Sequence, residues 1–122
     1  MDTHDSACAK NTAGATSEML KGVLEGMVLE IIRQEEVYGY EIVRRLGALG
    51  FEAIAEGTVY ALLARLERRR LFVISRRPSE LGPPRKFYRL SDRGKKELAA
   101  FWLRWEQLAE CIEQLRDNKK EG

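Results

Sequence analysis

The side chains that could do chemistry in this chain are mostly cations, and they are distributed unevenly. Between Arg65 and Arg93 the sequence carries ten basic and three acidic residues, a net charge of +7. Residues 17–64 carry four basic and eight acidic residues, a net charge of −4, although the whole 122-residue chain is at only +2. A basic segment in a near-neutral protein favours an acidic partner, with nucleic acid the leading candidate. A solvated surface with scattered ion pairs is the alternative.

Residue types that support catalysis are almost missing from the segments expected to fold. The single histidine, His4, lies in a small and polar stretch, residues 1–16, that we expect to be a mobile tail. No Ser/His/Asp or Cys/His arrangement can therefore form in the folded part. Cys8 and Cys111 do not have the spacing of a metal site. We expect no enzymatic activity, no bound metal and no cofactor.

The N-terminus shows no targeting signal. It is acidic and lacks the apolar stretch of a signal peptide, and no apolar run approaches the ~20 residues that span a bilayer. A structural disulfide between the two cysteines is not expected, because one of them lies in the polar tail. These observations predict a cytoplasmic, reduced protein without a membrane partner.

Apolar periodicity predicts two helices before residue 50. The first has Ser17 as its N-cap, carries apolar residues at helical spacing over residues 20–32, and ends near Arg33. The second follows a turn at Gly39 and is broken by the glycines of residues 47–50.

A third helix is predicted for residues 56–71, and its two faces differ sharply. The inward face is apolar at helical spacing and comprises Val59, Leu62, Leu63 and Leu66. The outward face has small side chains before a basic end, and it comprises Gly57, Ala61, Ala64 and Arg68. A low outward face lets the axis of a helix approach another surface closely.

Two strands complete this unit. Residues 71–78 and 85–90 are rich in β-branched and aromatic residues. Residues 80–84 are predicted to be a turn, because the two prolines there cannot continue a ladder. The fold is therefore expected to be mainly α with a small β-hairpin. Three helices followed by a hairpin is the order of a winged helix-turn-helix, here residues 17–91, whose third helix enters the DNA major groove.

The last helix is predicted for residues 92–118, with Ser91 as its cap and residues 119–122 as a tail. Its apolar residues follow a 3-4-3-4-3 spacing, which is typical of a seam between two helices. The seam comprises Leu98, Phe101, Trp105, Leu108, Ile112 and Leu115. Part of it can be an intramolecular contact. We predict that it forms the interface of a homodimer, because an apolar seam left in water is costly.

The winged-helix geometry identifies candidate contacts to double-stranded DNA. From the third helix they are Thr58, Tyr60, Arg65 and Arg68, and from the hairpin they are Arg76, Arg77, Arg85 and Lys86. Tyr38 and Tyr40 can contact phosphate or pack the start of the second helix, and the sequence does not favour either. Tyr60 can also be a packed tyrosine with its hydroxyl group at the surface.

Several motifs together resemble the PadR family of transcriptional regulators. They are YGYE from residue 38, GTVY from residue 57, and YRLS from residue 88 with Gly94. The resemblance runs from Met19 to the C-terminus, and the single long last helix is similar to the short branch, which includes multidrug-responsive repressors. It implies a ligand-responsive repressor that binds a pseudo-palindromic operator as a homodimer. An adaptor that binds proteins instead of DNA is the alternative.

The resemblance also implies a small-molecule effector. In a symmetric dimer Trp105 of each last helix lies near its counterpart, with Trp102 toward the edge of the seam. The indoles can form a slot for a planar aromatic molecule or a closed core without a ligand. Two positions depart from the family pattern. Arg70 stands where glycine is usual, and Ala64 where a basic residue is frequent, which leaves more of the DNA contacts to Arg65 and Arg68.

Overall fold

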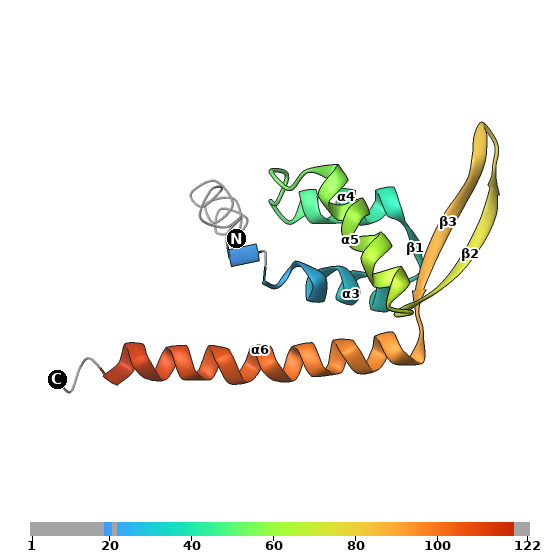
Figure 1. Cartoon of the computed structure of the whole chain (residues 1–122). Coiled ribbons are helices and arrows are strands. Elements are labelled where there is room, and N and C mark those ends of the chain that lie inside the picture. Colours follow the sequence, from blue (N-terminus) through green and yellow to red (C-terminus); the bar gives the residue numbers. More distant parts are fainter. Residues whose placement is uncertain (1–18, 21, 119–122) are drawn as a thin grey trace.

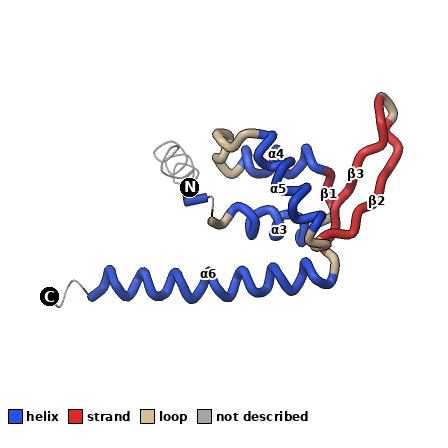
Figure 2. The backbone as a smooth tube through the Cα atoms, viewed as in Figure 1, coloured by secondary structure: helices blue, strands red, loops and turns tan. Residues whose placement is uncertain are grey.

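The computed structural model describes residues 19–20 and 22–118 (Figure 1). Its elements are α3 (Leu24–Gln34), β1 (Val37–Tyr38), α4 (Gly39–Ala48), α5 (Glu56–Arg68), β2 (Phe72–Ser79), β3 (Gly82–Leu90) and α6 (Asp92–Asn118). Figure 2 shows α3, α4 and α5 packed together, the sheet extending from one side of them, and α6 running alongside α3. The predicted mainly helical, winged-helix fold is confirmed. The predicted cap Ser17 and the predicted tails, residues 1–16 and 119–122, lie outside the described residues.

The first two helices differ from the prediction at their ends. Residues 19–20 are helical, but Gly22 and Val23 form a turn, so α3 begins only at Leu24. Glycine disfavours a helix by about 0.5–1 kcal/mol relative to alanine, which explains a break inside an apolar repeat. Gly47 lies within α4 instead of breaking it. The chain turns at Gly50, whose φ of 106° lies in a region that side chains disfavour.

The hydrophobic core lies between the three packed helices, the sheet and the first half of α6. The predicted inward face of α5 is confirmed, because all four of its residues are buried. The largest fully buried side chains come from four segments: Val28, Leu29, Ile32, Ile42, Leu46, Val59, Leu63, Leu66 and Leu71. This core fixes the position of α5 and leaves its opposite face exposed.

The sheet has three strands in the order β1-β3-β2, whereas the sequence predicted a two-stranded hairpin. The additional strand is β1, which has two residues and pairs with Phe87 and Tyr88 of β3. The predicted turn at residues 80–84 is also too long, because β3 begins at Gly82 and includes both prolines. Proline is tolerated there because β1 does not reach this part of β3 and the β2–β3 register is irregular between Arg77 and Ser79.

A tight junction joins the end of α5 to the start of α6. Arg70 follows α5 in the left-handed region, with a φ of 66°, a conformation that glycine adopts at lower cost than arginine. The hydroxyl group of Ser91 donates to the Arg70 carbonyl at 2.8 Å and accepts from the Gly94 N–H at 3.0 Å, which confirms the predicted cap. A Cβ atom at Gly94 would overlap the carbonyl oxygen of Leu71. The junction therefore holds α5 and α6 rigidly together.

The predicted seam of α6 divides into two parts. Leu98 is only 3% exposed, and the ring of Phe101 packs against α3 at Gly26, where a Cβ atom would overlap it. Both residues thus contribute to the core of their own chain. The later residues of the seam are exposed in the single chain, and they are Trp105, Leu108, Ile112 and Leu115. This second half of α6 projects beyond the packed helices (Figure 1).

Candidate nucleic-acid interface

The outward face of α5 is exposed and low. Gly57, Ala61 and Ala64 are all exposed, and a Cβ atom at Gly57 would meet no other atom within 4 Å. The predicted DNA contacts Thr58, Tyr60, Arg65 and Arg68 are exposed along the same helix. Packing within the chain therefore does not require a small residue at Gly57, and this face is free of large side chains that would keep another surface away.

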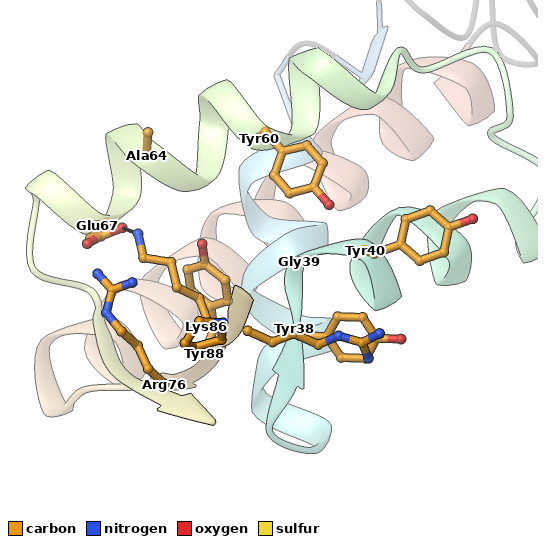
Figure 3. Close-up of a pocket in the computed structure, with 11 residues that line it drawn as sticks. Tyr38, Gly39, Tyr40, Tyr60, Ala64, Glu67, Arg76, Lys86 and Tyr88 are labelled. Carbon is orange, nitrogen blue, oxygen red and sulfur yellow. Dashed lines mark hydrogen bonds and ion pairs between the residues drawn. The ribbon is translucent and has the colours of Figure 1, made fainter. Parts of the chain in front are cut away.

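A cleft of about 730 Å³ separates α5 from the wing, the hairpin formed by β2 and β3. Figure 3 shows the side chains that line it, which come from the start of α4, from α5 and from both strands of the wing. Six of the predicted DNA contacts line this cleft: Tyr38, Tyr40, Tyr60, Arg76, Arg85 and Lys86. The other four predicted residues, Thr58, Arg65, Arg68 and Arg77, do not line it.

The four cations of the wing lie on two faces of the hairpin. Arg76 pairs with Lys86 across the strands and Arg77 pairs with Arg85, and adjacent pairs of a hairpin face opposite sides. The ammonium group of Lys86 lies 3.1 Å from a carboxylate oxygen of Glu67 on α5 (Figure 3). The wing therefore does not present its four charges as one row.

The second face of the wing is held by aromatic rings and a carboxylate. The guanidinium group of Arg77 forms an ion pair with Glu36 and lies 4.2 Å from the centre of the Phe87 ring. Arg85 lies over the ring of Tyr38, at 4.6 Å from its centre. Cation–π contacts of this kind orient a guanidinium group without neutralising it. Arg85 thus remains available to an anionic partner, whereas Arg77 already has one.

The three tyrosines predicted to contact DNA, Tyr38, Tyr40 and Tyr60, have different environments in the cleft. The ring of Tyr38 packs on Phe87 at 5.5 Å and beneath Arg85, whereas Tyr40 is about half exposed. Tyr60 lies over the start of α4, where a Cβ atom at Gly39 would come within 2.7 Å of its ring. Partial burial raises the pKa of Tyr60 above its usual value, so its hydroxyl group stays protonated and can donate a hydrogen bond.

Two cleft residues were missed by the sequence interpretation. Tyr88 is buried at the back of the cleft, where burial raises its pKa, and Glu67 lies at the front beside Lys86. Tyr88 and Leu90 are buried on either side of the exposed Arg89, and such alternation along a β-strand is a usable signal of an inward position. Glu67 stands out only as an acid within a basic segment. No sequence pattern connects it with Lys86, which is 19 residues away.

A second groove, of about 560 Å³, lies between α3, the end of α4 and α6. It is lined mainly by apolar side chains and includes both predicted ligand-binding residues, Trp102 and Trp105. The indole N–H of Trp102 donates to Glu30 at 3.0 Å. Hydrogen bonds from Arg33 lower the pKa of Glu30 to about 2, with smaller contributions from Trp102 and Gln34 and an opposing one from burial. The groove therefore combines exposed indole surface with an ionised carboxylate.

Two other features, a cluster of metal ligands and a membrane-spanning helix, are absent from the part of the chain that the structure describes. Among residues 19–20 and 22–118, no group of three or more His, Cys, Asp or Glu side chains is arranged to hold a metal ion. No helix within these ranges has both the length and the apolar character needed to cross a bilayer.

Comparison with known proteins identifies what the chain is similar to. Residues 28–100 match the model of the transcriptional regulator PadR-like family. A Streptococcus transcriptional regulator is 43% identical, with 80% of this chain and 96% of that chain covered and a TM-score of 0.73. A PadR-like regulator from Bacillus cereus is also 43% identical, with 80% and 95% covered and a TM-score of 0.72. Bacillus subtilis PadR in complex with operator DNA is 26% identical, with 66% of this chain and 47% of that chain covered and a TM-score of 0.59. The chain belongs to the PadR-like family of transcriptional regulators.

Proposed function

We propose that this regulator binds a pseudo-palindromic operator as a homodimer, with α5 in the major groove and the wing on the flanking backbone. The observation that carries this proposal is the exposed, low face of α5 beside a cleft lined by cations and tyrosines. A helix whose outward face has only small side chains can reach the groove floor, and the methyl groups of Ala61 and Ala64 can meet thymine methyl groups there. The operator complex of a relative supports the same partner.

The contacts divide by chemistry. Thr58, Tyr60 and Arg65 lie along α5 and can reach base edges or nearby phosphates. Arg68 stands at the basic end of the same helix. The wing offers Arg76, Arg77, Arg85 and Lys86 to the backbone, although Arg77 and Lys86 must exchange an internal carboxylate for a phosphate. Tyr38 and Tyr40 line the cleft and can donate their hydroxyl groups to phosphates. The proposed domains are therefore residues 17–91 for DNA and residues 92–118 for dimerisation.

A gel-shift experiment with genomic fragments tests this function and finds the operator. A two-fold dimer should protect half-sites about 10 bp apart or a multiple of that. If each subunit neutralises roughly four phosphates, log K should fall with log salt at a slope near −7. A slope near zero would exclude electrostatic DNA binding. It would instead favour the adaptor function, for which the ion pairs of Lys86 and Arg77 are the supporting observation.

Two variants separate DNA contacts from packing. Tyr60→Phe keeps the ring over Gly39 but removes the hydroxyl group, and Arg65→Ala removes an exposed guanidinium group. Both should weaken binding to the recovered fragment without lowering the unfolding temperature. A loss of stability together with unchanged affinity would assign these residues to the fold instead.

Dimerisation is proposed through the second half of α6. Trp105 is 44% exposed and Ile112 is 54% exposed in the single chain, although Trp105 also lines the groove beside α3. Exposed apolar residues at seam spacing are typical of a helix that pairs with another helix. Replacing Trp105 and Ile112 by glutamate should give a folded monomer in analytical ultracentrifugation. A well-folded dimer would remove this seam from the interface.

An aromatic effector is proposed for the groove that contains Trp102 and Trp105. Its exposed indoles can stack on a planar molecule, and their ring faces also suit a cationic one. A ligand that shifts α6 can act on α5 through the junction, where Arg69 forms ion pairs with Glu25 at 2.8 Å and Glu97 at 3.1 Å. Such a ligand relieves repression only if it prefers one dimer geometry.

Fluorescence titration with planar cationic dyes tests the effector site. Tryptophan quenching should appear in the wild-type dimer and disappear in Trp105→Ala, provided that this variant remains a dimer. Undiminished quenching in the variant would place a ligand elsewhere, and the absence of quenching in the wild type would favour a closed tryptophan core.

A further inference from the structure

The cleft that faces the proposed DNA contains a negative charge on α5 itself. The carboxylate of Glu67 lies 3.1 Å from the ammonium group of Lys86, and both side chains are about one-third exposed. Glu67 and Lys86 line the same cleft as Arg76, which pairs with Lys86 across the wing (Figure 3). On this face of the wing, Lys86 is therefore paired with an internal counterion on α5.

An internal counterion changes what the wing can contribute to a DNA complex. Affinity for DNA of any sequence comes mainly from cations that neutralise phosphates and release condensed counterions. If a phosphate replaces Glu67 at Lys86, one ion pair is exchanged for another and a carboxylate is left beside the polyanion. If Glu67 keeps Lys86, that cation contributes nothing to the backbone. In both cases the carboxylate reduces the part of the affinity that all sequences share.

We propose that Glu67 limits the phosphate-dependent, sequence-independent part of DNA affinity by competing with phosphate for Lys86. The inference rests on the proposed function, because it concerns the same DNA-facing cleft. Base contacts made by α5 do not depend on this carboxylate. The operator and all competing sites share this phosphate term, so the carboxylate lowers both affinities by the same route.

The test compares charge-neutral variants on a random-sequence 30-bp duplex over a range of salt concentrations. Glu67→Gln keeps an oxygen that can accept from Lys86 and removes only the charge. Glu113→Gln is the matched control, because Glu113 also forms an ion pair, with Arg116, but lies near the far end of α6. Both variants change the net charge equally, so a long-range effect of charge appears in both.

A freed Lys86 in each subunit of a dimer should steepen the salt slope by about 2, which at 0.1 M salt is an affinity gain of up to roughly 60-fold. The control should stay near the wild-type slope. The gain should vanish in the double variant Glu67→Gln/Lys86→Gln, because the freed cation is then absent. Thermal unfolding checks that every variant is folded.

Three results would overturn the inference. Glu67→Gln could match Glu113→Gln while the wild type binds with a steep salt slope, and the proposed function would then survive without this role for Glu67. The gain could persist in the double variant, which would exclude Lys86 as the cation concerned. The wild type could also fail to bind any duplex at low salt, and the inference would then fall together with the proposed function.

Discussion

Replacing Gly57 separates the role of the low face of α5 from the stability of the helix. Gly57 is the second residue of α5, and a Cβ atom there would meet nothing within 4 Å. Alanine should therefore fit without strain and favour the helix by about 0.5–1 kcal/mol. For a chain of this size, that corresponds to a rise in unfolding temperature of roughly 2–6 °C. Differential scanning calorimetry measures this rise.

Glutamine at the same position tests the close approach. Its helix propensity is near that of alanine, so Gly57→Gln should also be at least as stable as the wild type. Its longer side chain should hold the axis of α5 away from the groove floor. Losing one good base contact costs about 1–3 kcal/mol, so affinity for the recovered operator fragment should fall roughly 5- to 150-fold. Affinity for a random duplex should change little, because it depends on phosphates.

Gly57→Ala is the matched control, since it changes the backbone preference but adds only a methyl group. Fluorescence anisotropy with the operator fragment and with a random duplex gives both affinities for each variant. Wild-type operator affinity in Gly57→Gln would refute the placement of this face against the groove. A destabilised Gly57→Ala would refute the open space above Gly57.

Three further predictions concern the fold that holds α5. Gly94→Ala should destabilise the chain by about 3 kcal/mol, because the added methyl group overlaps the carbonyl oxygen of Leu71 and a backbone atom cannot move aside. Urea unfolding measures this loss, and an unchanged unfolding midpoint would contradict the prediction. Arg70→Gly should stabilise the chain by up to about 1 kcal/mol in the same assay, because it relieves a φ of 66°, and a destabilised variant would assign the side chain of Arg70 a packing role. The pKa of Glu30 is lowered in the folded state from 4.5 to about 2, so the stability that its carboxylate contributes is present above pH 4.5 and is lost as the pH falls toward 2. The free energy of unfolding of Glu30→Gln should therefore fall less than that of the wild type over this range. Parallel plots of unfolding free energy against pH for the two proteins would contradict the lowered pKa.

The sequence by itself determined the helices and their faces. The alternation of Val59, Leu62, Leu63 and Leu66 with small residues predicts which side of α5 is buried, because helical periodicity is a local property. The cap at Ser91 follows for the same reason, since its hydroxyl group bonds to a backbone N–H three residues later. The sequence also named, as candidate DNA contacts, six residues that line one cleft, although for Tyr38 and Tyr40 it left a packing role equally open.

Only the tertiary structure decided which residues become partners across the chain. A two-residue β1 forms because β3 offers it a neighbour, and two prolines enter β3 where β1 does not reach. The seam of α6 changes from packed to exposed between Phe101 and Trp105, and its spacing contains no sign of that change. Lys86 meets Glu67 because the packing of the sheet against the helices places this part of β3 beside the end of α5. Such contacts depend on distances in space between distant segments, whereas periodicity and capping depend only on neighbours along the chain.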